Sequence, residues 1–361
     1  MQNIALIASW LNQYGGAERV LEAAHEIFPR APIFTSIYSA RALPAAYHAW
    51  DIRASFLNRL PLIKHQQQLL LPLYPLAFES LDLRGYDTLL SITSAFAHGV
   101  HPRDGARHIC YCLTPARFLW NYREYIEREQ IPAPARALLP LLIPLLREWD
   151  RRAAARVHQF IAISSAVQAR IRECYARESV VIHPPVDVER FCASDARGDF
   201  FLIVSRLIPY KRIDLAVHAF NELGLPLVIA GDGRDRARLQ AMAHENIRFV
   251  GRVSDAERRD LLARCRAFIF PGEEDFGITP LEANASGRPV IAFAGGGARD
   301  TIREGVNGEF FRAASADALV ETVRRFDEKK FDARVLRAHA EKFSARVFQE
   351  KIAALVEADG K

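Results

Sequence analysis

The chain contains few cysteines, and their placement argues against a disulfide framework. Only five occur in 361 residues, and this odd, scattered set is typical of a protein from a reducing compartment. Cys110 and Cys112 alternate along one apolar run. Because no second pair accompanies them, we expect both to be buried packing residues. No Cys/His spacing typical of a zinc site is present, so the sequence predicts no metal centre.

The sequence also lacks an apolar run long enough to cross a bilayer. Its most apolar stretch, residues 138–146, contains two prolines and is less than half as long as the roughly 20 residues that a spanning helix needs. No cationic segment precedes the first apolar run, so a secretory signal peptide is not indicated. We therefore expect a cytoplasmic protein.

Motifs for nucleic-acid binding are missing as well. The chain has neither a basic helical repeat nor an aromatic–basic RNA motif. Its net charge is +5, and all of the excess lies before the domain junction: 20 Lys and Arg stand against 15 Asp and Glu up to Pro184, and 28 against 28 beyond it. A basic half of this kind suits a phosphorylated substrate or an anionic lipid, or serves solubility alone.

Short apolar runs alternate with helical patterns along the whole chain, which is typical of parallel, doubly wound α/β sheets. The length leaves room for two domains with separate cores. Pro184-Pro185 and the polar stretch 192–198 mark the junction between them. The predicted strands are Ile4–Ala8, Pro32–Ile37, Thr88–Ile92, His108–Cys112, Gln159–Ile163, Val180–His183, Phe200–Val204, Pro226–Ala230, Ile247–Val250, Ala267–Phe270 and Pro289–Phe293.

A pair of glutamates surrounds a predicted helix start in the second half of the chain. Glu274 and Glu282 follow the short apolar run 268–270, which reads as a buried strand. Thr279 is a suitable N-cap, with Pro280 in the first helical position. The free amides at this helix start, together with the helix dipole, suit a phosphate. The alternative interpretation is a capping box in which Glu282 satisfies the Thr279 N–H.

The spacing Glu-x7-Glu with an intervening Phe-Gly resembles the donor-site motif of the family 4 retaining glycosyltransferases. These enzymes share the GT-B fold, in which two Rossmann-like domains face each other across a cleft. The resemblance runs from Met1 to about Val356, and five further segments match family motifs in order. Two of them resemble the O-antigen mannosyltransferase-like branch, namely Tyr111–Trp120 and Val180–Asp187. The other three are Gly15–Glu18, Ser205–Lys211 and Ile229–Gly233.

The resemblance implies an α/β protein of the GT-B type with three parts. Residues 1–185 would form an acceptor-side Rossmann-like domain, and residues 186–334 a Rossmann-like domain that binds the nucleotide-sugar donor. Residues 335–361 would form a helix that packs back on the N-terminal domain.

The resemblance also implies the reaction. The expected function is retaining transfer of a hexose from a nucleotide-diphosphate sugar, with GDP-mannose weakly preferred. The acceptor would be polyprenyl-diphosphate-linked or another saccharide, in bacterial surface polysaccharide assembly. We expect no cofactor and no metal, because an Asp-x-Asp motif is missing and arginine, lysine and helix-end amides can replace a metal's charge. A nucleic-acid partner is not expected.

Three charged side chains receive catalytic roles from the resemblance: Arg206, Lys211 and Glu274. Negative charge builds on the diphosphate as it leaves, so fixed cations aimed at it lower the barrier. Arg206 can fork onto phosphate oxygens and Lys211 supplies a compact charge, although a solvated basic turn would have the same sequence. Glu274 would lie beside the transferred sugar, and Glu282 would accept from the ribose hydroxyls. The donor-binding set is Gly15, Gly16, Arg206, Lys211, Arg252, Val253, Glu274, Phe276, Gly277, Ile278, Thr279 and Glu282.

One position on the acceptor and sugar side departs from the family pattern. Relatives commonly carry His before the Thr-Pro of the segment that starts at Tyr111, where it contacts the donor sugar, whereas this chain has Leu113. The change implies a different sugar, such as a 6-deoxy donor, or reduced activity. His98 follows another strand and is either a substitute for that contact or a surface residue. The acceptor-side set is His98, Leu113, Thr114 and Arg117.

Three other functions fit parts of the pattern. A GT-B sugar-nucleotide epimerase would share the donor site and need no acceptor. A non-catalytic subunit that binds a nucleotide sugar would be consistent with Leu113. A dinucleotide oxidoreductase is disfavoured because no Gly-x-Gly-x-x-Gly follows the first strand.

Two segments of the basic half mix apolar residues with cations, namely Asn58–His65 and Leu138–Arg147. We expect them to make peripheral contact with anionic bilayers at the inner membrane, where a lipid-linked acceptor would be found. The alternative is that both segments are core helices.

Overall fold

The computed structural model describes residues 3–60, 67–122, 133–194 and 198–358. The chain divides into two compact units. Unit 1 comprises the residues up to His183 together with those from Gln349 onward, and unit 2 comprises Pro184–Phe348. The first boundary lies next to the prolines that mark the predicted junction. The predicted third part, 335–361, is shared between the units because the chain re-enters unit 1 only at Gln349.

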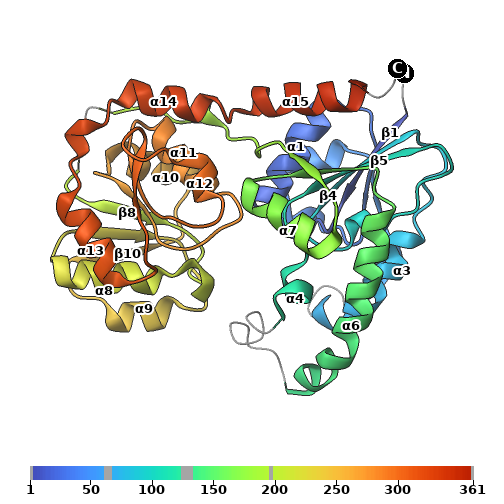
Figure 1. The fold of residues 1–361 in the computed structure, drawn as a ribbon, viewed down its shortest axis with the longest axis horizontal. Coiled ribbons are helices and arrows are strands. Elements are labelled where there is room, and N and C mark those ends of the chain that lie inside the picture. The colour runs from blue at the N-terminus through green and yellow to red at the C-terminus, as the bar shows by residue number, and fades with distance from the viewer. Residues whose placement is uncertain (1–2, 61–66, 123–132, 195–197, 359–361) are drawn as a thin grey trace. The chain divides into compact units, whose positions relative to one another are not determined.

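Unit 1 is built on a seven-stranded sheet in which every neighbouring pair of strands is parallel. The strand order is β3-β2-β1-β4-β5-β6-β7, so the order reverses between β1 and β4. Figure 1 labels β1, β4 and β5 at the centre of this unit. The strands are β1 (Ile4–Ala8), β2 (Ile33–Thr35), β3 (Ile52–Ala54), β4 (Thr88–Thr93), β5 (Arg107–Cys112), β6 (Gln159–Ala162) and β7 (Ser179–Val181).

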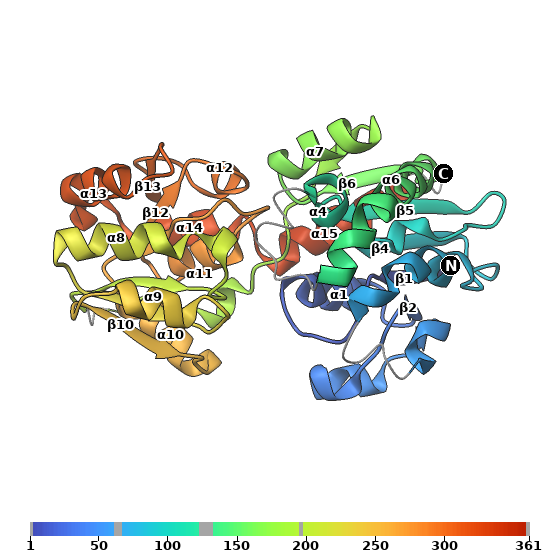
Figure 2. The same cartoon turned by 90° about the horizontal axis from the view of Figure 1, so that it is seen from below.

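Helices flank the sheet of unit 1, as Figures 1 and 2 show. The apolar faces of α3, α4 and α6 pack with strand residues in a core in which Phe78 and Phe96 are fully buried. The helices are α1 (Gly16–Ile27), α3 (Tyr74–Glu79), α4 (Arg117–Trp120), α6 (Ala133–Ala155) and α7 (Ser165–Tyr175), joined by α15 (Ala345–Ala358) from Gln349 onward. Short 3-10 turns connect them at Ala40–Ala42, Ala45–Ala49, Phe56–Arg59, Gln67–Leu73 and Ala97–Gly99.

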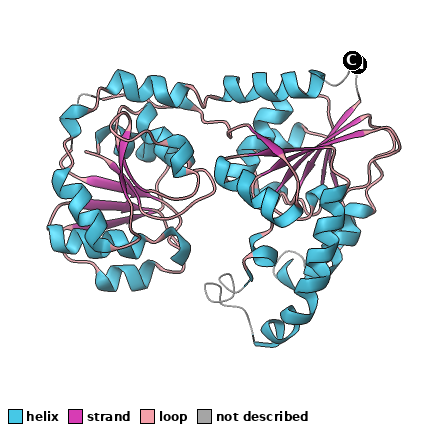
Figure 3. Ribbon diagram, viewed as in Figure 1, coloured by secondary structure: helices cyan, strands magenta, loops and turns pink. Residues whose placement is uncertain are grey.

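Unit 2 has a six-stranded parallel sheet in the order β10-β9-β8-β11-β12-β13, which reverses between β8 and β11. Figure 3 shows the strands of this sheet enclosed by helices. The strands are β8 (Phe201–Val204), β9 (Leu227–Ala230), β10 (Ile247–Gly251), β11 (Phe268–Phe270), β12 (Val290–Phe293) and β13 (Gly308–Phe311). The helices are α8 (Ile213–Leu223), α9 (Arg236–Met242), α10 (Asp255–Arg264), α11 (Ile278–Ala285), α12 (Ala298–Thr301), α13 (Ala316–Arg325) and α14 (Ala333–Glu341), with 3-10 turns at Val188–Arg190, Pro209–Lys211 and Glu328–Lys330.

The predicted doubly wound α/β class is confirmed, and all eleven predicted strands are present with ends shifted by a few residues. Two strands, β3 and β13, were not predicted. Both lie at the edge of a sheet, where one side of the strand has no neighbour. A three-residue edge strand such as β3, which carries Arg53 and no fully buried residue, lacks the apolar run by which a central strand is recognised.

Within the described ranges, no helix combines the length and the apolar character that crossing a bilayer requires.

Candidate functional site

The candidate site of unit 2 lies where its strand order reverses. Strands β8 and β11 are hydrogen-bonded neighbours at this point. In open parallel sheets, ligands bind outside the carboxyl ends of the strands at such a switch point. The loop after β8 carries Arg206 and Lys211, and the loop after β11 carries Glu274. The fold therefore brings the three predicted catalytic residues to one edge of one sheet.

The two loops are in close contact. The Lys211 ammonium forms an ion pair with Oε2 of Glu274 and lies 5.2 Å from the centre of the Tyr210 ring. Both charged side chains are largely buried, with 13% of Lys211 and 21% of Glu274 exposed. A Cβ at Gly272 would lie 2.7 Å from the Lys211 carbonyl oxygen, so only glycine allows the loops to approach this closely. A pair of opposite charges is thus held at the switch point.

Arg206 differs from Lys211 because its side chain is exposed. Across the part of the chain that the structure describes, its guanidinium has no hydrogen-bond or ion-pair partner. The backbone on either side is fixed, since Leu207 donates from its amide to the carbonyl oxygen of Asp232 at 3.0 Å. A guanidinium on a fixed loop, with its donors unfilled, is suited to bind an anion.

The loop Gly231-Asp232-Gly233 after β9 packs against the backbone of the loop that carries Arg206. Gly231 has a φ of +135°, and a Cβ there would lie 1.8 Å from the carbonyl oxygen of Ser205. A Cβ at Gly233 would lie 2.3 Å from the Leu207 oxygen. These glycines are therefore required by close packing against the backbone around Arg206.

Arg252 and Val253 lie on the turn that follows β10. The Gly231 amide donates to the carbonyl oxygen of Gly251 at 2.7 Å, which joins this turn to the Gly231–Gly233 loop. Arg252 is exposed, and its Nε lies 3.9 Å from a carboxylate oxygen of Asp232. The predicted donor-binding residues Arg252 and Val253 therefore lie on a turn that adjoins the Arg206 loop.

The start of α11 differs from the prediction. Helix α11 begins at Ile278, and Gly277 precedes it with a φ of +97° and no side-chain cap. The predicted N-cap at Thr279 and the capping box with Glu282 are therefore wrong. The physical reason is that glycine adopts this positive φ at little cost, so the chain turns into the helix before it reaches Thr279. Phe276, just before the turn, is buried and lies 6.0 Å from the Phe343 ring.

Glu282 lies in α11 with only 1% of its side chain exposed. Nη1 of Arg258 donates to both of its carboxylate oxygens, at 2.9 Å to Oε1 and 2.8 Å to Oε2. The Arg258 guanidinium also lies 5.5 Å from the Phe191 ring centre and 3.4 Å from Asp255. Sequence reasoning missed Arg258 because it stands among six charged residues between Asp255 and Arg264 that nothing in the spacing separates.

A second feature absent from the prediction is the loop Gly295-Gly296-Gly297 after β12. The Gly297 amide donates to the Glu274 carbonyl oxygen at 2.8 Å. A Cβ at Gly296, whose φ is +55°, would lie 2.2 Å from that oxygen, and one at Gly297 would lie 2.4 Å from Cα of Phe276. The sequence did contain an indication of this contact, because three consecutive glycines after a predicted strand are typical of a close approach between backbones.

In unit 1 the predicted glycines begin α1. Gly15 is the N-cap, in an extended conformation with a φ of −167°, and Gly16 is the first helical residue. Glu18 is buried in the first turn, with 3% exposed. A Cβ at Gly15 would lie 3.5 Å from Oε2 of Glu18, an ordinary contact. The neighbouring loops are joined by Ser9, whose hydroxyl donates to the Ala95 carbonyl oxygen at 2.9 Å.

The acceptor-side residues Leu113, Thr114 and Arg117 follow the carboxyl end of β5. Leu113 is half-buried, and its amide donates to the Thr93 carbonyl oxygen at 2.8 Å. The Thr114 hydroxyl accepts from Nη1 of Arg170 at 3.4 Å. Arg117 is the first residue of α4. The structure therefore places these three side chains on one short segment beside the carboxyl end of β4.

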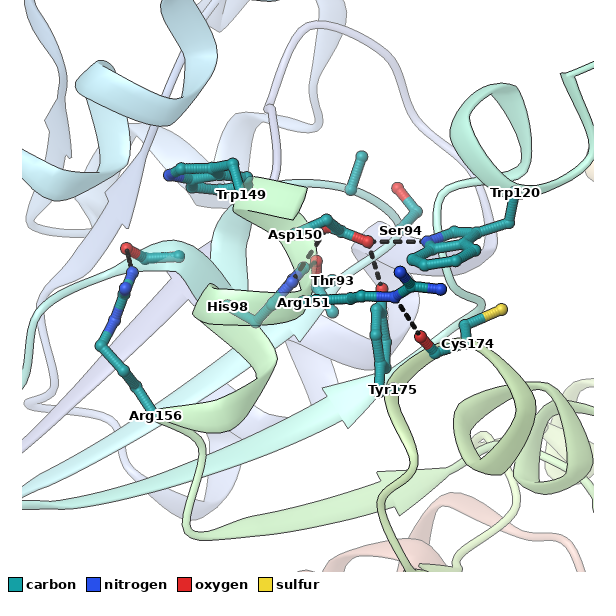
Figure 4. A network of polar contacts seen from close by, with 12 residues as sticks. Thr93, Ser94, His98, Trp120, Trp149, Asp150, Arg151, Arg156, Cys174 and Tyr175 are labelled. Atoms are coloured by element: carbon teal, nitrogen blue, oxygen red, sulfur yellow. Dashed lines mark hydrogen bonds and ion pairs between the residues drawn. The ribbon is translucent and has the colours of Figure 1, made fainter. Parts of the chain in front are cut away.

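His98 is buried, so the alternative interpretation of it as a surface residue is wrong, whereas its assignment to the acceptor and sugar side stays a prediction. Only 2% of its side chain is exposed, and Nε2 lies 3.1 Å from Oδ1 of the fully buried Asp150. Its other ring nitrogen lies 3.5 Å from the Thr93 hydroxyl. Asp150 also accepts from Nε1 of Trp120 and the hydroxyl of Tyr175, both at 2.8 Å, as Figure 4 shows. Both ring nitrogens of His98 thus already face polar groups inside unit 1.

Burial sets the ionisation state of the groups around this network. It raises the pKa of the Tyr175 phenol well above its usual value, and the neighbouring Asp150 carboxylate adds to the effect. It also raises the pKa of the Cys110 thiol to about 12, as expected for a packing residue. Among the residues that the structure describes, His, Cys, Asp and Glu form no cluster of three or more that could hold a metal ion.

Comparison with known proteins finds a family that is similar to part of unit 2. Residues 189–343 match the family described as "Glycosyl transferases group 1". O-antigen chain mannosyltransferase C of Escherichia coli is 33% identical over 135 residues, which cover 35% of this chain and 36% of that protein. A GDP-mannose-dependent alpha-mannosyltransferase of Mycolicibacterium smegmatis is 44% identical over 101 residues, 27% of this chain and 26% of that protein. The uncharacterized glycosyltransferase MJ1178 of Methanocaldococcus jannaschii is 23% identical over 210 residues, 57% and 60% of the two chains. The matched stretch thus spans less than two thirds of each relative.

Solved structures resemble the whole chain. Anabaena Alr3699/HepE in complex with UDP has a TM-score of 0.75 at 17% identity, over 99% of this chain and 100% of that chain. Sucrose-phosphate synthase (tll1590) from Thermosynechococcus elongatus has a TM-score of 0.75 at 17% identity, over 99% of each chain. At this identity the likeness shows the fold alone, which is GT-B.

Proposed function

We propose that this chain, in which residues 189–343 match the group 1 glycosyl transferases, is a retaining, metal-independent hexosyltransferase that uses a nucleotide-diphosphate sugar. The observation that carries the proposal is the Lys211–Glu274 ion pair at the switch point of unit 2, on the same loop as Arg206, whose guanidinium has no partner among the described residues. Two cations from one loop and a carboxylate from the next suit a substrate with both a diphosphate and a hydroxylated sugar.

In this mechanism Arg206 and Lys211 stabilise the departing diphosphate. Negative charge grows on that group as the sugar leaves, and fixed cations lower the barrier most when they are already oriented. Lys211 is pre-positioned by Glu274, and its ammonium has three donors, so it can bind a phosphate oxygen while it keeps the carboxylate. Glu274 accepts from hydroxyls of the transferred sugar. The leaving phosphate takes the acceptor's proton, so the mechanism assigns no protein nucleophile or base.

GDP-mannose is the proposed donor. Support comes from relatives, since four of the proteins that match are named GDP-mannose-dependent mannosyltransferases and another is an O-antigen chain mannosyltransferase. The proposed acceptor is a polyprenyl-diphosphate-linked or other saccharide in bacterial surface polysaccharide assembly. One of the solved structures that resemble this chain is a complex with UDP. UDP-sugars should therefore be included among the donors tested.

One assay tests this function against the alternatives. The protein is incubated with GDP-mannose, GDP-rhamnose, UDP-glucose or UDP-galactose and a prenyl-diphosphate-linked saccharide, with and without EDTA. The expected result is a glycosylated lipid with the donor's anomeric configuration, formed equally well in EDTA. Isomerised donor without glycosylated lipid would identify an epimerase. Donor binding without turnover of any kind would identify a non-catalytic subunit.

We also propose peripheral contact with the cytoplasmic face of a membrane through unit 1. In the helix α6, Leu141 and Leu145 are 71% and 70% exposed, whereas Ile143 and Leu146 on the opposite side are buried. The helix is thus neither wholly core nor wholly polar. Of the other predicted segment, Asn58–His65, residues 61–66 lie outside the described residues. Co-sedimentation with phosphatidylglycerol vesicles at low salt tests the contact, and absence of binding would reject it.

A further inference from the structure

In unit 1 the indole of Trp120 is hydrogen-bonded to the buried carboxylate of Asp150. Oδ2 of Asp150 accepts from Nε1 of Trp120 and from the Tyr175 hydroxyl, both at 2.8 Å. Oδ1 faces His98 at 3.1 Å, and Asp150 is fully buried. Figure 4 shows these side chains converging from the 3-10 turn Ala97–Gly99 and from α4, α6 and α7. Because every partner is on a different element, the indole is held as a rigid surface.

Two arginines of α6 lie on that indole. The guanidinium carbons of Arg147 and Arg151 are 5.8 and 4.9 Å from the Trp120 ring centre. Each arginine also directs its Nε at a backbone carbonyl oxygen, that of Leu119 at 2.6 Å for Arg147 and that of Cys174 at 3.4 Å for Arg151. The two positions are one helical turn apart, about 6 Å along the axis. Both guanidiniums are therefore oriented before any ligand binds.

The outer ends of both guanidiniums have their donors unfilled. Within the residues that the structure describes, the Nη groups of Arg147 and Arg151 have no hydrogen-bond partner, and neither arginine is paired with a carboxylate. Like charges at this spacing destabilise a helix. The neighbouring Arg152 shows the ordinary arrangement on the same helix, since its Nε lies 2.8 Å from Glu148. Two oriented guanidinium groups whose charge is not neutralised by a carboxylate are suited to bind an anion with several oxygens.

We infer that Arg147, Arg151 and Trp120 form the site for the diphosphate of a prenyl-linked acceptor. The inference rests on the proposed function, which calls for such an acceptor, and it deepens that proposal by assigning residues. The lipid end of the acceptor has a counterpart on the same helix. Leu141 and Leu145 are exposed on α6, six and two residues before Arg147. Anion donors and exposed apolar side chains on one helix fit an amphiphile with a phosphorylated head better than a free phosphate.

Binding of geranyl diphosphate tests the inference without any transfer reaction. Calorimetry is done in an Arg206→Ala/Lys211→Ala background, so that the diphosphate cannot bind at the donor site. Arg147→Gln/Arg151→Gln is then added, with Arg152→Gln as the matched control on the same helix. Thermal melting confirms that each variant is folded. A lack of glycosyltransferase activity would leave this measurement unaffected, so failure of the proposed function and failure of this site can be told apart.

We expect geranyl diphosphate to bind in the background variant. Arg147→Gln/Arg151→Gln should weaken that binding about tenfold or more, whereas Arg152→Gln should change it by about twofold at most. Absence of binding in the background variant, or equal losses in the test and control variants, would overturn the assignment. Phosphatidylglycerol vesicles form a second arm. If the double variant loses vesicle binding and keeps its affinity for geranyl diphosphate, the arginines bind phospholipid headgroups and the acceptor assignment is wrong.

Discussion

Arg258 holds the carboxylate of Glu282 in the interior of unit 2, donating from a single nitrogen to both oxygens at 2.9 and 2.8 Å. Burying a carboxylate to 1% exposure is costly unless a cation accompanies it. The pair explains why an acidic residue can occupy a buried position of α11. It also changes the expected effect of altering Glu282, because a cation would then be left without its partner.

Arg258→Met should lower the free energy of unfolding by about 3 kcal/mol, since it removes the arginine that binds both oxygens of the buried Glu282 carboxylate. Arg258→Met/Glu282→Met should cost less than the single change, because both charges are removed together. Urea unfolding measures both. Equal or greater destabilisation in the double variant would show that the pair is not the source of the effect.

The same double variant tests whether Glu282 binds ribose. A nucleoside diphosphate should bind it about tenfold more weakly than the parent protein, because a carboxylate acceptor for the ribose hydroxyls is lost. Pyrophosphate, which has no ribose, should bind both proteins equally. If the two ligands lose affinity to the same extent, the change has disturbed the phosphate site and the ribose role is unsupported.

Arg206→Ala should leave the melting temperature unchanged, since the side chain is exposed and unpaired in the described structure. It should weaken nucleoside diphosphate binding and slow turnover about tenfold or more, because one oriented cation is worth about 2 kcal/mol in a transition state of this kind. Arg264→Ala, which removes an exposed arginine paired with Asp260, is the control. Calorimetry showing equal affinities for the two variants would remove Arg206 from the site.

Gly297→Ala should impair the donor site through the backbone. The added Cβ would lie 2.4 Å from Cα of Phe276 and 2.5 Å from the Asp275 carbonyl oxygen, so the loop that carries Glu274 must move. We expect a loss of about 2 kcal/mol in stability and weaker donor binding. Gly85→Ala, where a Cβ would meet nothing within 4 Å, is the control. Normal donor affinity in Gly297→Ala would show that the position of Glu274 does not depend on this contact.

Leu113→His tests whether the leucine sets the donor sugar. If the protein uses a sugar without a hydroxyl at carbon 6, the histidine should lower activity on that donor and improve use of a hexose that has the hydroxyl, because an unpaired polar group costs about 1–3 kcal/mol. Donor panels for the two proteins measure the change. Identical preferences would show that this side chain does not contact the sugar. His98→Gln should not mimic the effect, since His98 is enclosed with Asp150.

His108 should make the protein less stable as the pH falls. Burial lowers the pKa of its imidazole to about 3, whereas the unfolded chain has a value near 6.5. Between those values the unfolded state binds the proton and the folded state does not, so the free energy of unfolding decreases as pH falls. From pH 7 to 5 this group should account for about 2 kcal/mol.

His108→Gln keeps a partner for the Ser91 hydroxyl, which lies 2.9 Å from Nε2 of His108. The variant should therefore lose about 2 kcal/mol less than the parent protein between pH 7 and 5. Urea midpoints at pH 7, 6 and 5 measure this. His48→Gln, which changes an exposed histidine, should follow the parent curve. A His108→Gln curve parallel to the parent would mean that His108 does not titrate in this range.

The sequence was sufficient to predict the central strands because each is buried on both faces and appears as an apolar run between turns. Arg206, Lys211 and Glu274 were grouped by the family resemblance, and the fold places them on loops that follow the neighbouring strands β8 and β11. The edge strands β7 and β10 were predicted, whereas β3 and β13 were missed. Strand β3 has only three residues, none of them fully buried, and β13 begins with Gly308 and Glu309, so neither has a clear apolar run.

Contacts between distant segments could not be predicted from local patterns. Arg258 and Glu282 are paired across 24 positions, and His98 meets Asp150 across a longer interval. The local sequence around these residues does not indicate which distant residue each one contacts. The start of α11 was misplaced for a related reason, because Thr279-Pro280 has the local signature of a cap while the conformation of Gly277 decides the turn.

The division of unit 1 into two stretches of chain determines the order in which the protein can fold during synthesis. Residues from Gln349 onward complete the unit, with Gln349 donating to Glu26 at 2.6 Å and Arg107 donating to the Leu355 and Val356 carbonyls at 3.2 Å. The ribosome releases these residues only after all of unit 2 has emerged. Unit 2 can therefore close as it is made, whereas the first unit to be translated is the last to be finished.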